Sequence, residues 1–340
     1  MEKAKYTSLT NFVLSAFHHI TPMPLHHPLP DSQKMCVAHR CILIKMTRSR
    51  MKVAFLNGPC FYLLAITIES MSTSRLIIIT GAACGLGRLL AERFIASGDR
   101  VAAVDLDQNT LDATAKALGS LYVPVLIDLA DPEAIQKGFS DIEVQFGPTD
   151  ILINNAGIVA GRHLLELTTA DIRTTFAVNV ESHFHTTRAV LPAMIERGKG
   201  HIVTIASAGG IAATARISAY SSSKFAAVGF DDALRVELRR LGHPIDTTLV
   251  APFFIDTGMF AGVRTRFPRL LPILTPEYAV GRIMKAIQKK KRRLLMPRLV
   301  YATYPLRLLP VSWYDAIADL LGVTRSMDDF RGRSGPSEPQ

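Results

Sequence analysis

Short apolar runs alternate with amphipathic stretches over most of the chain, from Leu76 to residue 297. The run LIIIT at 76–80 is wholly apolar, as expected of a strand buried on both faces. Further runs of strand length are 101–105, 122–128, 150–155, 201–207, 245–251 and 293–297. Apolar residues recur at helical spacing over 86–97, 108–118, 132–146, 171–197, the stretch that opens at Tyr220, and 276–291. The alternation predicts an α/β fold: a doubly wound parallel sheet covered by helices on both faces, as a three-layer single domain.

The two ends of the chain differ from this middle part. Residues 1–70 show no sustained period and are expected to be a poorly ordered or weakly apolar extension, with the working domain beginning at Met71 and running to 293. The most apolar window, 53–68, is shorter than the ~20 residues that a membrane helix needs. A weak membrane anchor in this window is the alternative to a poorly ordered extension. An apolar segment follows at 294–330, and a disordered tail is expected at 331–340.

Charge is concentrated outside the central domain. Residues 1–70 carry eight Lys/Arg against three Asp/Glu, and 282–333 carry twelve against four, although the whole chain is only +10. The middle is therefore nearly neutral, which argues against a nucleic-acid-binding core. It also contains only one cysteine, Cys84, which suits a reducing, cytoplasmic location. Cys36, His39 and Cys41 lack a fourth ligand at metal spacing, so no metal site is predicted.

A glycine-rich loop joins the first central strand to the first helix. The sequence TGAACGLG contains Gly81, Gly85, Leu86 and Gly87 at a strand-to-helix turn, where backbone N–H groups and a helix N-terminus can bind a pyrophosphate. Asp105 ends the next strand, 18 residues after Gly87. A carboxylate there can accept hydrogen bonds from ribose hydroxyls and would repel a 2′-phosphate. We therefore expect NAD as the cofactor rather than NADP.

The stretch YSSSK places Tyr220 and Lys224 at positions i and i+4 of the predicted helix. Their side chains would project side by side. An ammonium next to a phenol favours the phenolate, so Lys224 is expected to lower the pKa of Tyr220 and make it a usable acid and base.

Together these motifs resemble the short-chain dehydrogenase/reductase family over about residues 71–290. The resemblance rests on TGAACGLG, NNAG at 154–157, Asn179, Ser207 and Tyr220-x-x-x-Lys224, in that order along the chain. The stretches APFFIDTGMF (251–260) and SMDDFRGR (326–333) are similar to the branch with retinol dehydrogenases and hydroxysteroid dehydrogenases. The resemblance implies a Rossmann-type fold, an oxidoreductase acting on CH–OH groups, and a homodimer or homotetramer.

The resemblance also implies roles for single residues. Tyr220 would exchange a proton with the substrate, Lys224 would bind the nicotinamide ribose, and Ser207 would bind the substrate oxygen. Asn179 would orient a water molecule that links Lys224 to solvent. The further cofactor contacts implied are Asp128, Asn154, Ala156, Gly157 and Thr257.

The loop 253–275 is expected to form the substrate side of the site. It carries Phe253, Phe254, Met259 and Phe260, which suit a bulky apolar alcohol or ketone such as a retinoid, a steroid or another lipid-like molecule. The basic run at 289–293, next to the apolar segment 294–330, suits either contact with a membrane surface or a cover over the pocket. Two other functions stay open here: a non-enzymatic NAD-binding regulatory protein, and an epimerase or dehydratase on the same fold.

Overall fold

The computed structural model describes the backbone of residues 33–37, 40–47, 50–57, 64–69 and 74–332, and the side chains of 74–332. The chain divides into two compact units, residues 1–73 and 74–340. Each unit is described by itself. The predicted tail at 331–340 lies outside the described residues from 333 onward.

The first unit contains an antiparallel sheet in the order β1-β2-β3-β4. Its strands are Gln33–Val37, Arg40–Thr47, Arg50–Asn57 and Leu64–Glu69. Sequence patterning predicted no regular element between residues 1 and 70, so these strands are a finding of the structure. The apolar window at 53–68 falls on parts of β3 and β4 and on the segment between them, which lies outside the described residues.

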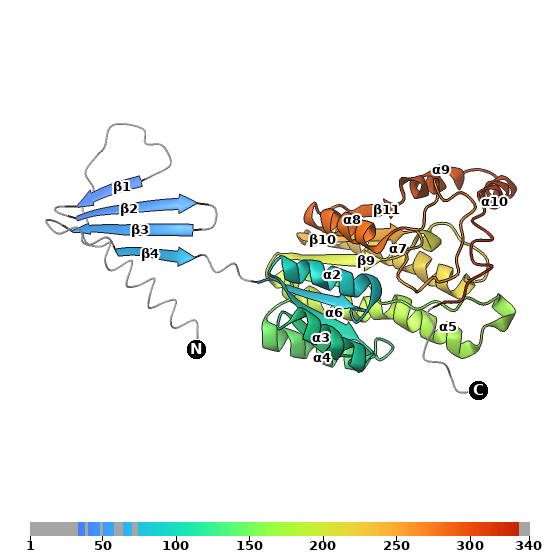
Figure 1. The fold of residues 1–340 in the computed structure, drawn as a ribbon, viewed down its shortest axis with the longest axis horizontal. Coiled ribbons are helices and arrows are strands. Elements are labelled where there is room, and N and C mark those ends of the chain that lie inside the picture. The colour runs from blue at the N-terminus through green and yellow to red at the C-terminus, as the bar shows by residue number, and fades with distance from the viewer. Residues whose placement is uncertain (1–32, 38–39, 48–49, 58–63, 70–73, 333–340) are drawn as a thin grey trace. The chain divides into compact units, whose positions relative to one another are not determined.

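The second unit is built on a seven-stranded, entirely parallel sheet in the order β11-β10-β9-β8-β5-β6-β7 (Figure 1). Its strands are Leu76–Thr80, Arg100–Asp105, Tyr122–Leu126, Ile151–Asn154, Gly200–Ile205, Ile245–Pro252 and Arg293–Met296. The chain moves outward from β5 to β7 and then returns to β8 on the other side of β5. Ligands bind at such a reversal, outside the carboxyl ends of the strands.

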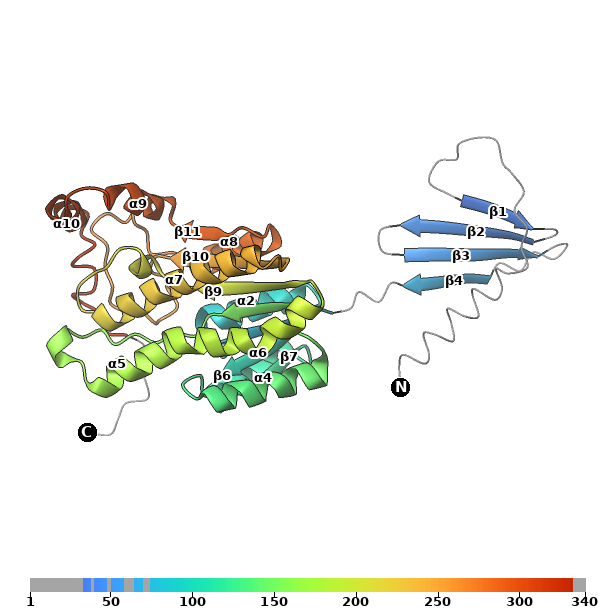
Figure 2. The same cartoon turned by 180° about the vertical axis from the view of Figure 1, so that it is seen from behind.

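Helices cover both faces of this sheet, so the predicted three-layer α/β/α fold is confirmed. The α-helices are α2 Gly85–Ala96, α3 Gln108–Leu118, α4 Pro132–Phe146, α5 Thr169–Phe176, α6 Ser182–Glu196, α7 Ser218–Arg240, α8 Pro276–Gln288, α9 Thr303–Leu306 and α10 Val311–Leu320. Apolar residues of α2, α3 and α8 pack on one face of the sheet, and those of α4, α6 and α7 pack on the other. Figure 2 shows α4, α6 and α7 over the second face.

Local sequence explains where several helices begin. Asp131 accepts hydrogen bonds from the amides of Glu133 and Ala134, and Pro132 occupies the first turn of α4. Thr275 caps α8 in the same way, again with proline at the first position. These side chains satisfy amides that have no partner within a helix, and the proline needs none.

Several boundaries differ from the sequence-based ones, and two of these differences affect the candidate site. The helix predicted over 171–197 is three pieces, because a π-helical turn at Ala177–Glu181 separates α5 from α6. The strand predicted over 122–128 ends at Leu126, so Asp128 lies in the following loop. Short π-helical turns are often found at functional sites, and this one contains Asn179.

Candidate active site

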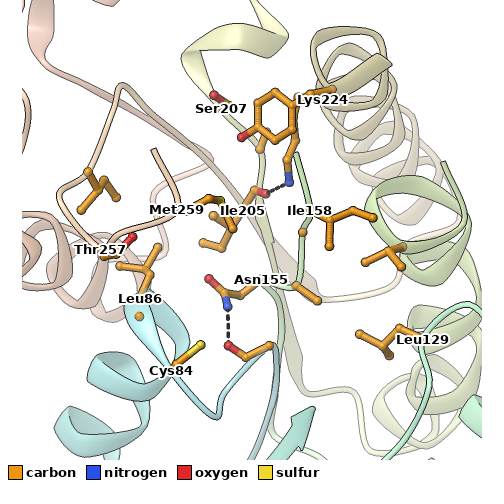
Figure 3. Close-up of a pocket in the computed structure, with 18 of the residues that line it drawn as sticks. Cys84, Leu86, Leu129, Asn155, Ile158, Ile205, Ser207, Lys224, Thr257 and Met259 are labelled. Carbon is orange, nitrogen blue, oxygen red and sulfur yellow. Dashed lines mark hydrogen bonds between the residues drawn. The ribbon is translucent and has the colours of Figure 1, made fainter. Parts of the chain in front are cut away.

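A groove of about 300 Å³ lies at the carboxyl ends of β5, β6, β8, β9 and β10. Most of the residues that the sequence proposed for the site line it. They are Gly81, Gly85, Leu86, Asp105, Asp128, Ala156, Gly157, Ser207, Tyr220, Lys224, Phe253, Thr257, Met259 and Phe260. Figure 3 shows how Leu86 of α2, Lys224 of α7 and the loop residues Ser207, Thr257 and Met259 surround this space. Four proposed residues do not line the groove: Gly87, Asn154, Asn179 and Phe254.

The glycine-rich loop passes close to the neighbouring strand. Gly81 has φ +65°, and a Cβ on it would lie 2.9 Å from the Cα of Ala156. Gly85 also has a positive φ, of +58°. Gly87 is placed differently from the prediction, because a Cβ there would lie only 2.1 Å from the Gly81 carbonyl oxygen. Its role is therefore the close packing of α2 against the loop rather than contact with a ligand.

Asp105 lies at the end of the groove formed by the glycine-rich loop, and two backbone amides fix its carboxylate. Its Oδ2 accepts a hydrogen bond from the Ala83 amide at 3.0 Å, and Oδ1 accepts one from the Leu106 amide at 2.8 Å. Tyr122 was not foreseen from the sequence, yet its hydroxyl donates to the Ala82 carbonyl at 3.0 Å. The carboxylate and the glycine-rich loop are thus parts of one hydrogen-bonded unit.

The two neighbouring asparagines at the end of β8 differ from the prediction, which named only Asn154 as a cofactor contact. Asn154 is fully buried; its Oδ1 accepts from Thr186 at 2.8 Å, and its side chain points into the core rather than into the groove. Asn155 lines the groove instead, and its Nδ2 donates to the Thr80 and Gly81 carbonyls at 2.9 and 3.0 Å. Because β8 ends at Asn154, the groove is lined by the residues that follow the strand, Asn155, Ala156 and Gly157.

Tyr220 and Lys224 project from the first turns of α7, one turn apart as predicted. Both are almost completely buried. The Lys224 Nζ donates to the Ile205 carbonyl at 3.0 Å, as Figure 3 shows, and lies 5.8 Å from the centre of the Tyr220 ring. Ser207 follows β9, and its Oγ accepts from the Gly209 amide at 3.0 Å. A phenol, an ammonium and a hydroxyl therefore meet at one end of the groove.

Burial shifts the pKa values of Tyr220 and Lys224, and the shift of Tyr220 is opposite to the predicted one. It raises the pKa of Tyr220 to about 12, while a hydrogen bond with Ser207 acts in the opposite direction. It also lowers the pKa of Lys224 to about 8. The expected lowering of the Tyr220 pKa by Lys224 is therefore wrong in this structure. Removing each group from water disfavours its charged form, and this desolvation is the main cause of both shifts.

Asn179 lies outside the groove and connects its two walls. Its Oδ1 accepts from the Ile158 amide at 2.8 Å, and its Nδ2 donates to the Ile158 carbonyl at 2.9 Å and to the Ser223 Oγ at 3.0 Å. The Ser223 hydroxyl in turn donates to the Tyr220 carbonyl at 2.7 Å. The π-helical turn thus joins the loop after β8 to the turn that carries Tyr220. The water-binding role of Asn179 stays a prediction.

Ser223 is a residue whose role the sequence did not reveal. The three serines between Tyr220 and Lys224 suggested only small size, but Ser223 is completely buried and carries the hydrogen bonds just described. A buried serine in a helix needs a partner for its hydroxyl, which is the one signal that could have found it.

A second, apolar cavity of about 100 Å³ is also lined by Ser207 and Tyr220. It shares Ser207, Tyr220, Phe253 and Phe260 with the groove, and Phe254 lines this cavity instead of the groove. Its outer wall comes from the C-terminal part of the chain: Leu299, Val300, Ala302, Thr303, Leu306, Leu321, Val323 and Ser326. Segments distant in sequence therefore enclose the space next to Tyr220.

Comparison with known proteins identifies this arrangement. The model of the short chain dehydrogenase family matches residues 75–267. The chain belongs to the short-chain dehydrogenase family. Epidermal retinol dehydrogenase 2 of Homo sapiens is 40% identical over 75% of this chain and 84% of that protein. Short-chain dehydrogenase/reductase family 16C member 6 of Bos taurus is 37% identical over 79% of this chain and 87% of that protein.

A solved family member supports the cofactor class. A short-chain dehydrogenase/reductase from Burkholderia phymatum in complex with NAD is 25% identical, with a TM-score of 0.63 over 78% of this chain and 98% of that one. The resemblance to the branch with retinol dehydrogenases is confirmed, and so is an oxidoreductase that acts on CH–OH groups with a nicotinamide cofactor. The regulatory and epimerase or dehydratase alternatives are set aside.

The groove itself fits such a cofactor. Its glycine loop leads into the N-terminus of α2, where amides and the helix dipole favour a pyrophosphate. At the other end, a Cβ on Gly157 would lie 3.2 Å from the Lys224 Nζ, so only glycine leaves that space open. The residues that would bind the dinucleotide are thus the loop 81–85, Asp105, the 155–157 backbone and Lys224.

Among residues that the structure describes, no helix has the length and apolar character needed to cross a membrane.

Proposed function

We propose that this short-chain dehydrogenase interconverts a bulky apolar alcohol and its carbonyl compound, with NAD as cofactor and Tyr220 as the acid and base. The observation that carries the proposal is the apolar cavity whose lining includes both Ser207 and Tyr220. Phe253, Phe254 and Phe260 form an aromatic wall there, with ring centres 4.5 and 5.1 Å apart. An apolar substrate placed in this cavity has its oxygen next to the groove.

The chemistry follows from the side chains at the junction of groove and cavity. Ser207 donates a hydrogen bond to the substrate oxygen and so stabilises negative charge that develops there. In the oxidation, Tyr220 acts as the phenolate and accepts the substrate's hydroxyl proton as the hydride leaves the carbon; in the reduction, the neutral phenol donates that proton to the substrate oxygen. Lys224 holds its positive charge beside the ring. When bound, NAD supplies the hydride acceptor and a positive charge that favours phenolate.

NAD is preferred over NADP in this proposal because of Asp105. Its carboxylate lines the groove next to the glycine-rich loop and is fixed by two backbone amides. A 2′-phosphate at that position would meet a negative charge that cannot turn away, whereas ribose hydroxyls can donate to it.

Relatives named retinol dehydrogenases support an apolar substrate. The direct test is oxidation by the purified full chain with NAD, using matched alcohols of increasing apolar length, including a retinoid and a steroid. The proposal predicts that kcat/KM rises with apolar size and is higher with NAD than with NADP. Preference for a small polar alcohol would contradict the substrate class, and preference for NADP would contradict the role of Asp105.

The apolar surface of α10 supports a further part of the proposal, contact with an anionic membrane. This helix has no buried residue, and Leu308, Val311 and Trp313 near its start are 87%, 74% and 65% exposed. The basic run at 289–293 contributes less charge than its sequence suggests, because Lys290 pairs with Asp246 and Arg293 with Asp232. Exposed apolar groups and basic groups can each contribute to contact with anionic lipid.

Trp313 is the only tryptophan of the chain and therefore reports this contact directly. Anionic vesicles should shift its emission to shorter wavelength at low salt, and less so at high salt. Changing Lys289 and Lys291 to Gln should weaken the shift without changing turnover of a soluble alcohol. An unchanged spectrum with anionic vesicles at low salt would remove the membrane from the proposal.

A further inference from the structure

The last described residues, 326–332, form a strap that binds two of the loops around the catalytic tyrosine and packs against a third. The amides of Arg331 and Gly332 donate to the Ala261 carbonyl at 2.9 and 3.3 Å, and the Arg264 amide donates to the Ser326 carbonyl at 3.2 Å. From the loop after β9, Arg216 donates to the Asp328 carbonyl at 2.6 Å. The strap therefore fixes the loops that follow β9 and β10 at the open end of the site.

At two glycines outside the cofactor loop, a side chain would collide with the strap. A Cβ on Gly161, in the loop after β8, would lie 2.0 Å from a ring carbon of Phe330. A Cβ on Gly262 would lie 2.0 Å from the Asp329 carbonyl oxygen, and this residue also has φ +90°. Neither glycine contacts the groove, so their lack of a side chain serves the passage of the strap.

The strap also provides an apolar contact for the catalytic residue. Met327 is completely buried in one cluster with Ile217, Tyr220, Phe254 and Val263. The Tyr220 and Phe260 rings are 5.7 Å apart at their centres, and Phe260 is 6.4 Å from Phe330. A continuous set of packed side chains thus runs from the catalytic phenol to the end of the strap.

The strap contributes to the walls of two cavities of different character. Ser326 lines the apolar cavity next to Tyr220. Phe330, Arg331 and Gly332 line a wider cavity of about 670 Å³, together with polar residues such as Arg162 and Asp171. Tyr220 lines the first cavity but not the second. The strap therefore lines both spaces, and the wider cavity also shares Gly157, Ile158 and Met259 with the groove that Tyr220 lines.

We propose that the strap 326–332 determines substrate selectivity: it packs Met327 beside Tyr220 and fixes the loops after β9 and β10, so that the catalytic cavity stays apolar and favours apolar alcohols at Tyr220. The proposal rests on the proposed function and adds to it a named specificity residue, Met327. The burial that raises the pKa of Tyr220 agrees with a site kept dry in this way.

The first test compares two methionines with equal burial. Met327 and Met194 are both 0% exposed, but Met194 lies in α6, away from the groove and both cavities. Met327→Ala in the full chain should lower the ratio of kcat/KM for a long apolar alcohol to that for a small polar alcohol, by roughly tenfold or more. Met194→Ala should destabilise the fold to a similar extent and leave this ratio unchanged. NADH affinity should stay at the wild-type value in both.

The second test needs no catalysis. Gly161 does not have a positive φ, so alanine there meets only the Phe330 ring. Gly161→Ala should displace the strap and speed hydrogen exchange of the Arg264 amide, and Phe330→Ala added to it should restore most of the protection. Unchanged exchange in Gly161→Ala would overturn the packing on which the proposal rests.

The two proposals fail in different ways. An active Met327→Ala with the wild-type substrate ratio overturns the role of the strap alone and leaves the proposed function intact. A wild-type protein that oxidises no alcohol overturns the proposed function, and the selectivity role of the strap with it.

Discussion

The cofactor side of the groove is built from short loops, whereas its substrate side is built from segments far apart in the chain. On the cofactor side, Gly81, Asp105 and Asn155 each lie at the end of a strand or directly after it, close to neighbouring backbone groups. On the substrate side, Tyr220 is enclosed by the loop after β10 and by Met327 near the end of the described chain. The first side needs only the sheet, while the second needs the C-terminal segment to be in place.

This difference indicates how the two sides can change independently. A substitution in the strap leaves the cofactor loops untouched, and a substitution at Asp105 leaves the apolar cavity untouched. Lys224 and Ser223 connect the cofactor side with the substrate side, because α7 contributes residues to both. The expected effects of variants follow from these positions.

Lys224→Met should have the largest effect of the variants outside Tyr220. It removes the ammonium beside Tyr220 and the hydrogen bond to the Ile205 carbonyl, so turnover should fall on the order of 10²-fold or more, and NADH should bind more weakly. Loss of turnover with unchanged NADH affinity would place Lys224 on the substrate side only. Thermal unfolding checks that the fold is kept.

A change at Asp105 should affect the cofactor side alone. Asp105→Asn with Cys84→Arg keeps an acceptor for the Ala83 amide, removes the negative charge and adds a partner for a 2′-phosphate. The ratio of kcat/KM for NADP to that for NAD should rise roughly tenfold or more. The preference among alcohols should stay as in the wild type; if it changes too, the two sides are coupled.

Ser223→Ala tests the connection between the sides. The variant loses the hydrogen bonds to Asn179 and to the Tyr220 carbonyl, which is worth about 1 kcal/mol or somewhat more. We expect kcat to fall about five- to tenfold with little change in KM. Ser221→Ala is the matched control, because the buried Ser221 hydroxyl makes no hydrogen bond to the part of the chain that the structure describes. Equal effects of the two variants would exclude a positioning role.

Asp231 belongs to neither side and should alter stability rather than activity. Burial, followed by the charge of Asp232, raises its pKa to about 7. The folded protein therefore keeps a proton there that the unfolded chain releases near pH 4, so stability should fall as pH rises from about 4 to 7 and then level off. Asp231→Asn should remove this slope in melting temperature against pH. Asp232, whose pKa is lowered, should behave oppositely and lose its stabilising ion pairs as pH falls.

The contrast between the two sides also decides what could be predicted from the sequence. The parallel sheet, its helices and the residues Gly81, Asp105, Ser207, Tyr220 and Lys224 follow from local patterns and from the family resemblance. Asn155 rather than Asn154 lines the groove because β8 ends at Asn154, and sequence patterns do not locate the end of a strand to within one residue. The contact of Phe330 with Gly161 joins segments that are far apart in the sequence, and no local pattern reveals it. The direction of the Tyr220 pKa shift depends on burial, which the pairing with Lys224 does not disclose.

The acid–base role of Tyr220 is the central claim, and turnover by Tyr220→Phe tests it most directly. Phenylalanine keeps the ring that packs against Phe260 and Met327, and removes only the hydroxyl. We predict unchanged NADH binding and a loss of alcohol oxidation by a factor on the order of 10²–10⁴. Oxidation of an apolar alcohol by this variant at a rate near that of the wild type would contradict the account.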